Sequence, residues 1–142
     1  MFKSCNIEIR VKAGDTDFTG NVYHPRCFEW FSISRIEILR LSEIRFLNDG
    51  SISIKNEPQK ISFVIGETFA RFHAPIRFDE IIEINTKIKE VKAKTIRFEH
   101  NILNKSDGKL LVNGYSISVC IDKTKNKSIN IPDRVVELLK NN

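Results

Sequence analysis

The chain has 142 residues, and a length of this order favours one domain, over residues 1–142. A hydrophobic content of 41% and a charged content of 29% are those of an ordinary globular protein. The net charge of +5 comes from scattered lysines, which fits an anionic small molecule better than nucleic acid. No signal peptide or bilayer-spanning apolar run is recognisable, and three dispersed cysteines argue against a metal site or disulfides, so we expect a cytoplasmic protein.

The first half of the chain predicts a strand, a loop and a helix. The strand is expected over 5–12, where apolar and charged residues alternate. A loop rich in Asp, Thr, Gly and Asn follows over 14–24. A helix is expected over 26–44, introduced by Pro25, because no Gly or Pro interrupts this run. Its apolar residues cover most of its circumference, which indicates a buried helix with a sheet curled around it.

The second half predicts an antiparallel meander. Residues 46–60 form a connection with room for a short helical piece. A strand with Gly66 inside it is predicted at 61–72, and alternating residues predict three more, at 81–91, 95–103 and 110–121. A hairpin turn at 105–108, a polar turn at 122–128 and a last helix at 133–140 complete the chain. The expected fold class is therefore α+β, with a five-stranded antiparallel sheet around a long helix.

The string DTDFTGNVYH at residues 15–24, with the aromatic-rich helix that follows it, resembles a known family. It is similar to the 4-hydroxybenzoyl-CoA thioesterase group of hotdog-fold proteins, which includes the Tol–Pal-type acyl-CoA thioesterases. The resemblance extends through 72–80 and covers nearly the whole chain. It implies an acyl-CoA thioesterase that needs no cofactor, since coenzyme A is part of the substrate. It also implies a homodimer or homotetramer with active sites at subunit interfaces.

The resemblance also implies roles for individual residues. Asp17 matches the family's catalytic carboxylate, and His24 matches a histidine near the thioester; Tyr23 beside it belongs to the substrate-binding residues. Glu67 is a second carboxylate candidate, on a strand expected to face the helix, because related hotdog branches use an acid there.

Three further residues are expected to bind substrate. Lys92, Lys94 and Thr95 lie where related enzymes place basic and hydroxyl residues against the nucleotide part of coenzyme A. A solvated turn is the alternative interpretation for these lysines.

Thioester hydrolysis needs a nucleophile or base, donors for the oxyanion and an acyl pocket. Asp17 can attack the carbonyl or activate water, and the N–H groups at the helix start after His24 can hold the oxyanion. The alternative is that Asp15 and Asp17 only cap turns, and for Asp15 we prefer that interpretation. His73 and His100 are expected to be structural.

Two other functions remain open from the sequence. One is a thioesterase for an acyl carrier protein in a biosynthetic pathway, and the other is a non-catalytic hotdog module that binds an acyl ligand. Asp17 and His24 together speak against the second.

Overall fold

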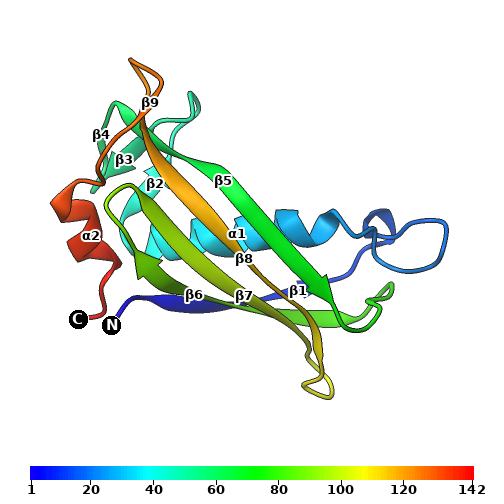
Figure 1. Cartoon of the computed structure of the whole chain (residues 1–142). Helices are drawn as coiled ribbons and strands as arrows, with labels where there is room; N and C mark the ends of the chain where they lie inside the picture. Colours follow the sequence, from blue (N-terminus) through cyan, green and yellow to red (C-terminus); the bar gives the residue numbers. More distant parts are fainter.

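The computed structural model describes all 142 residues, and its main feature is a curled antiparallel sheet with helix α1 lying along one face (Figure 1). The strand order is β1-β6-β7-β8-β5, and β9 pairs with β8. These strands are β1 (Ser4–Arg10), β5 (Ile61–Phe72), β6 (Ile81–Val91), β7 (Thr95–Asn104), β8 (Leu110–Asp122) and β9 (Lys127–Ser128). The predicted α+β class and the five long strands are confirmed.

Helix α1 (Arg26–Leu41) stops before the predicted end at residue 44. Ser42 caps it, with a side-chain hydroxyl that donates to the Ile38 carbonyl at 2.9 Å. Glu43 then adopts a φ of 62°, a left-handed conformation that ends the helix without a glycine. No residue type in the sequence marks this stop, so the helical pattern runs past it.

The connection after α1 is a small sheet, and the short helical piece considered for it is wrong. Strands β2 (Ile44–Phe46), β3 (Ile52–Ile54) and β4 (Glu57–Pro58) pair in that order, antiparallel. Ile52 and Ile54 are buried, and they share a core cluster with the C-terminal half of α1 and with helix α2 (Asp133–Leu139). This end of the molecule is therefore structural core.

A buried polar network joins α1 to the sheet at its middle. The Ser34 hydroxyl donates to Thr86 Oγ1 at 2.6 Å, and Thr86 Oγ1 is hydrogen-bonded to His100 Nδ1 at 2.8 Å. The other ring nitrogen of His100 is hydrogen-bonded to Ser116 Oγ at 2.8 Å. The Phe31 ring stacks on the imidazole, with centroids 4.2 Å apart. Both ring nitrogens of His100 are thus used in hydrogen bonds inside the protein, in keeping with the structural role expected for this residue.

Burial in this network lowers the pKa of His100 to about 3, and the nearby positive charge of Arg35 acts in the same direction. The imidazole is therefore neutral at physiological pH.

The sheet curls around α1 as predicted, and in the single chain it buries the side of the helix that faces it. Ile33 and Leu41, on the side of α1 away from the sheet, are 49% and 55% exposed. The sheet covers one side of the helix, while the other side is open. Neither α1 nor α2 has the length and apolar character needed to cross a bilayer.

Candidate active site

The loop between β1 and α1 is closed by a short stem. The Tyr23 N–H donates to the Asp15 carbonyl at 2.8 Å, and Thr16 pairs with Val22 in an isolated bridge. The Val22 N–H also donates to the Ile76 carbonyl at 2.7 Å, which ties the stem to the segment after β5. The loop tip, with Asp17, is therefore carried on a fixed base directly before the helix.

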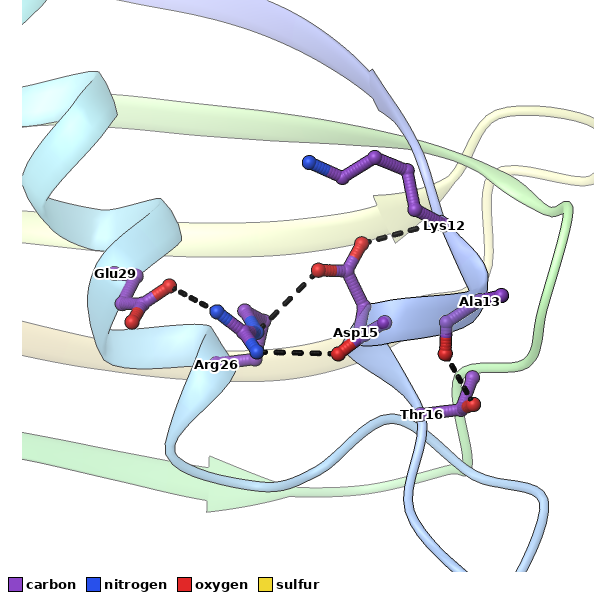
Figure 2. Close-up of polar contacts among 7 residues, drawn as sticks. Lys12, Ala13, Asp15, Thr16, Arg26 and Glu29 are labelled. Atoms are coloured by element: carbon purple, nitrogen blue, oxygen red, sulfur yellow. Dashed lines mark hydrogen bonds and ion pairs between the residues drawn. The ribbon is translucent and has the colours of Figure 1, made fainter.

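Asp15 is the buried acid of the pair, with 4% of its surface exposed. Figure 2 shows its carboxylate between the backbone of Lys12 and the guanidinium of Arg26. The Lys12 N–H donates to Asp15 Oδ2 at 2.8 Å, and Arg26 Nε lies 3.3 Å from Oδ1. This geometry gives Asp15 a structural role, as the turn interpretation predicts.

Asp17, in contrast, is solvent-accessible at the loop tip. Its Oδ1 accepts hydrogen bonds from the Thr19 N–H at 2.7 Å and the Thr19 hydroxyl at 2.5 Å. These bonds lower the pKa of Asp17, and the positive charge that His24 can carry contributes further. Asp17 is therefore an ionised carboxylate whose second oxygen has no partner within the chain.

The helix start differs from the expectation in one respect. The N–H groups of Arg26, Cys27 and Phe28 donate to the carbonyls of Tyr23, His24 and Pro25 at 2.8, 3.2 and 3.1 Å. These tight turns occupy the donors after His24, because Pro25 is already helical at φ −62° and ψ −18°. The His24 N–H has no partner within the chain and is the donor left free at this end.

A cavity of about 310 Å³ lies beside this helix start, between the loop and the segment after β5. Its lining residues are Asn21, Val22, Cys27, Phe72, His73, Ala74, Pro75 and Ile76. The His24 ring meets the ring of Phe72, a lining residue, edge-on with centroids 6.3 Å apart, and its centroid is 5.4 Å from that of the Tyr23 ring, so His24 lies beside the cavity wall. Burial raises the pKa of the Cys27 thiol to about 12, so the thiol stays protonated at neutral pH. Cys27 therefore forms part of the cavity wall and does not act as a nucleophile.

Glu67 does not face the helix, contrary to the expectation. A bulge at Gly66 shifts the pairing of β5 with β8 from Ile65–Ser118 to Glu67–Ile117. Since paired residues project to the same face, Glu67 lies with Ile117 on the outer face of the sheet. There it accepts a hydrogen bond from the Tyr115 hydroxyl. Glu67 is therefore separated from the loop by the sheet itself.

Lys92, Lys94 and Thr95 lie at the opposite end of the sheet from Asp17. Strand β6 begins beside Arg10 and ends near Ser4, so the β6–β7 turn is at the end where the two termini meet (Figure 1). An 11-residue strand is roughly 35 Å long. One chain therefore does not bring these residues to its own Asp17 and His24.

The chain is similar in sequence to curated acyl-CoA thioesterases. The chain is 28% identical over 128 residues to the acyl-CoA thioester hydrolase YbgC of Escherichia coli, covering 90% of both chains. It is 29% identical over 128 residues to the acyl-CoA thioesterase YbgC of Haemophilus influenzae, covering 89% of this chain and 88% of that one.

Two solved structures show the same fold. A mutant 4-hydroxybenzoyl-CoA thioesterase complexed with 4-hydroxybenzoyl-CoA aligns with a TM-score of 0.84 and 20% identity, over 96% of this chain and 99% of that one. BH1999 gentisyl-coenzyme A thioesterase aligns with a TM-score of 0.80 and 27% identity, over 95% and 99%. The family model of the thioesterase-like superfamily matches residues 11–139 of the chain. This hotdog-fold chain therefore belongs to the thioesterase-like superfamily.

Proposed function

We propose that the protein hydrolyses an acyl- or aroyl-CoA thioester to the free acid and coenzyme A. The observation that carries the proposal is that one loop, closed by a short stem, holds both an ionised Asp17 and the free His24 N–H at the start of α1. The adjoining cavity is of a size for a small acyl or aroyl group. The relatives named acyl-CoA thioesterases support the same reaction class.

In this mechanism the carboxylate of Asp17 attacks the thioester carbonyl or takes a proton from the attacking water. The His24 N–H, at the positive end of the α1 dipole, donates to the oxyanion that forms. The His24 ring, held by Tyr23 and Phe72, orients the thioester at the cavity mouth. Coenzyme A leaves as a thiolate, which is a good leaving group, so the reaction needs no metal or cofactor.

A second copy of the chain completes the site in this proposal. The basic turn with Lys92, Lys94 and Thr95 can meet the nucleotide part of coenzyme A only if it comes from another protomer in antiparallel orientation. Strand β5 is a free edge of the sheet, and Ile65 and Phe69 on it are 41% and 40% exposed, as expected of an uncovered interface. We therefore propose a homodimer, or a homotetramer built from it, in the cytoplasm.

The test is the release of free thiol from a panel of short, long and aromatic acyl-CoA thioesters. Asp17→Asn should lower turnover by orders of magnitude. The chain offers a matched control in Asp49, whose Oδ1 accepts the same two bonds, from the Ser51 N–H at 2.9 Å and the Ser51 hydroxyl at 2.5 Å. Asp49→Asn changes the same kind of turn away from the loop and should leave turnover intact. If the two substitutions change turnover equally, Asp17 only stabilises its turn and is not the catalytic carboxylate.

The same acyl group presented on an acyl carrier protein separates the carrier alternatives. Faster hydrolysis from the carrier protein would make that protein the substrate. Binding of an acyl-CoA without any turnover would favour a non-catalytic acyl-binding module.

A further inference from the structure

Arg26, the first residue of α1, spreads its three guanidinium nitrogens over three partners (Figure 2). Nε lies 3.3 Å from Asp15 Oδ1, Nη2 donates to the Gly14 carbonyl at 3.2 Å, and Nη1 donates to Glu29 Oε2 at 2.6 Å. A cation at the first turn of a helix is opposed by the helix dipole. The two carboxylates offset that cost and raise the pKa of Arg26, and the hydrogen bond that Arg26 donates to Glu29 has the largest effect.

The contact with Asp15 links this guanidinium to the catalytic loop. Asp15 forms the base of the stem, because its carbonyl accepts the Tyr23 N–H while its carboxylate accepts the Lys12 N–H. Asp17 stands two residues beyond Asp15 on one arm of the stem. His24 follows Tyr23 directly on the other arm. A shift of Asp15 therefore moves Asp17 relative to the His24 N–H.

We infer that Arg26 is a positioning residue for thioester hydrolysis, which acts through Asp15 on the placement of Asp17 against the start of α1. The inference rests on the proposed role of Asp17. Without the guanidinium, Asp15 is a carboxylate that is 4% exposed and has no cation beside it. Such a group draws water or moves outward, and the stem moves with it. A displacement of about 1 Å in a reacting group can cost a factor of 10² in rate.

The experiment compares Arg26→Gln, Arg26→Lys and Arg40→Gln by steady-state kinetics on the best acyl-CoA, well below each variant's Tm. Arg26→Gln should lower kcat roughly 10- to 100-fold and leave KM within about threefold, because placement of the nucleophile affects the chemical step. Arg26→Lys should be intermediate, since one ammonium cannot replace a three-way fork. Arg40, which pairs with Glu37 at 2.7 Å three positions earlier on the same helix, is the matched control and should show no change.

A double substitution gives a readout that general destabilisation would not imitate. If Arg26 acts through Asp15, the kcat of Asp15→Asn/Arg26→Gln should equal that of the worse single variant. Additive losses, a loss confined to KM, or an Arg26→Gln kcat within about twofold of the wild type would each overturn the inference. If Arg26→Gln does not fold, Arg26→Lys, which keeps the charge, carries the same test.

The failure of this inference can be told from the failure of the proposed mechanism. An Asp17→Asn variant with wild-type turnover would remove both. An inactive Asp17→Asn together with a fully active Arg26→Gln would remove only the positioning role.

Discussion

The buried histidine on β7 predicts a loss of stability in mild acid. In the folded chain the pKa of His100 is about 3, whereas the ordinary value is 6.5. Between these two values the unfolded chain binds a proton at this position and the folded chain does not. Stability therefore rises with pH across this window, is fully present above pH 6.5, and is lost as the pH falls towards 3.

The magnitude follows from the two pKa values. One proton taken up only by the unfolded state costs about 2 kcal/mol of unfolding free energy between pH 8 and pH 5, and about 4 kcal/mol by pH 3. A domain of this size has a total unfolding free energy of roughly 5–15 kcal/mol, so the effect is large. The part between pH 8 and pH 5 lies above the range in which carboxylates titrate, and the other two histidines, His24 and His73, lie at the surface.

The assay is urea unfolding of the wild type and of His100→Gln at several pH values from 8 to 5. The wild type should lose about 2 kcal/mol, and the variant, although less stable throughout, should show a much flatter dependence. The imidazole signals of His100 in NMR spectra should stay constant over the same range. A native-state titration of His100 near pH 6.5, or equal pH slopes for the two proteins, would refute the reasoning.

Three further predictions concern the sheet, the basic turn and the network. Gly114→Ala places a Cβ in a clash with the Phe69 carbonyl oxygen, which pushes β5 away from β8. We expect a loss of roughly 3 kcal/mol in unfolding free energy and a Tm lower by roughly 10 °C, and an unchanged Tm would contradict this prediction. Lys92→Ala/Lys94→Ala should raise KM for acyl-CoA with kcat unchanged, and a lower kcat at constant KM would argue against nucleotide binding. Thr86→Val removes the shared partner of His100 and Ser34, and should lower the urea midpoint by an amount equivalent to about 1–3 kcal/mol without altering kcat.

Much of the fold could be predicted because period-2 alternation is strong in β1, β6 and β7. The end of α1 could not, because a left-handed Glu43 stops it and the sequence shows neither Gly nor Pro there. The small sheet after α1 was also missed, since strands as short as Ile52–Ile54, buried at every position, have no alternation to detect.

The candidate site was predictable only where its residues are adjacent in sequence. Asp17 and His24 share one loop, so the motif locates both. Glu67 was predicted on the wrong face of the sheet because one extra residue at Gly66 reverses which side chains of β5 face the helix. The alternation of residues in the sequence does not reveal a single bulge. The prediction of the oxyanion donors was wrong for a similar reason. The N–H groups after Pro25 are already hydrogen-bonded within tight turns, which the sequence alone does not reveal.

Helix α1 is held in two places that serve different purposes. At its middle, Ser34 and Phe31 join the buried network around His100, which carries no group that reaches the cavity. At its first turn, Arg26 holds the stem on which Asp17 and His24 stand. Changes in the network should therefore lower the unfolding free energy at constant kcat. Changes at Arg26 should lower kcat strongly and the unfolding free energy only a little, because its contacts lie at the surface. A His100→Gln variant that loses kcat without losing stability would show that the two ends of the helix are coupled, and that the network helps to place the catalytic loop.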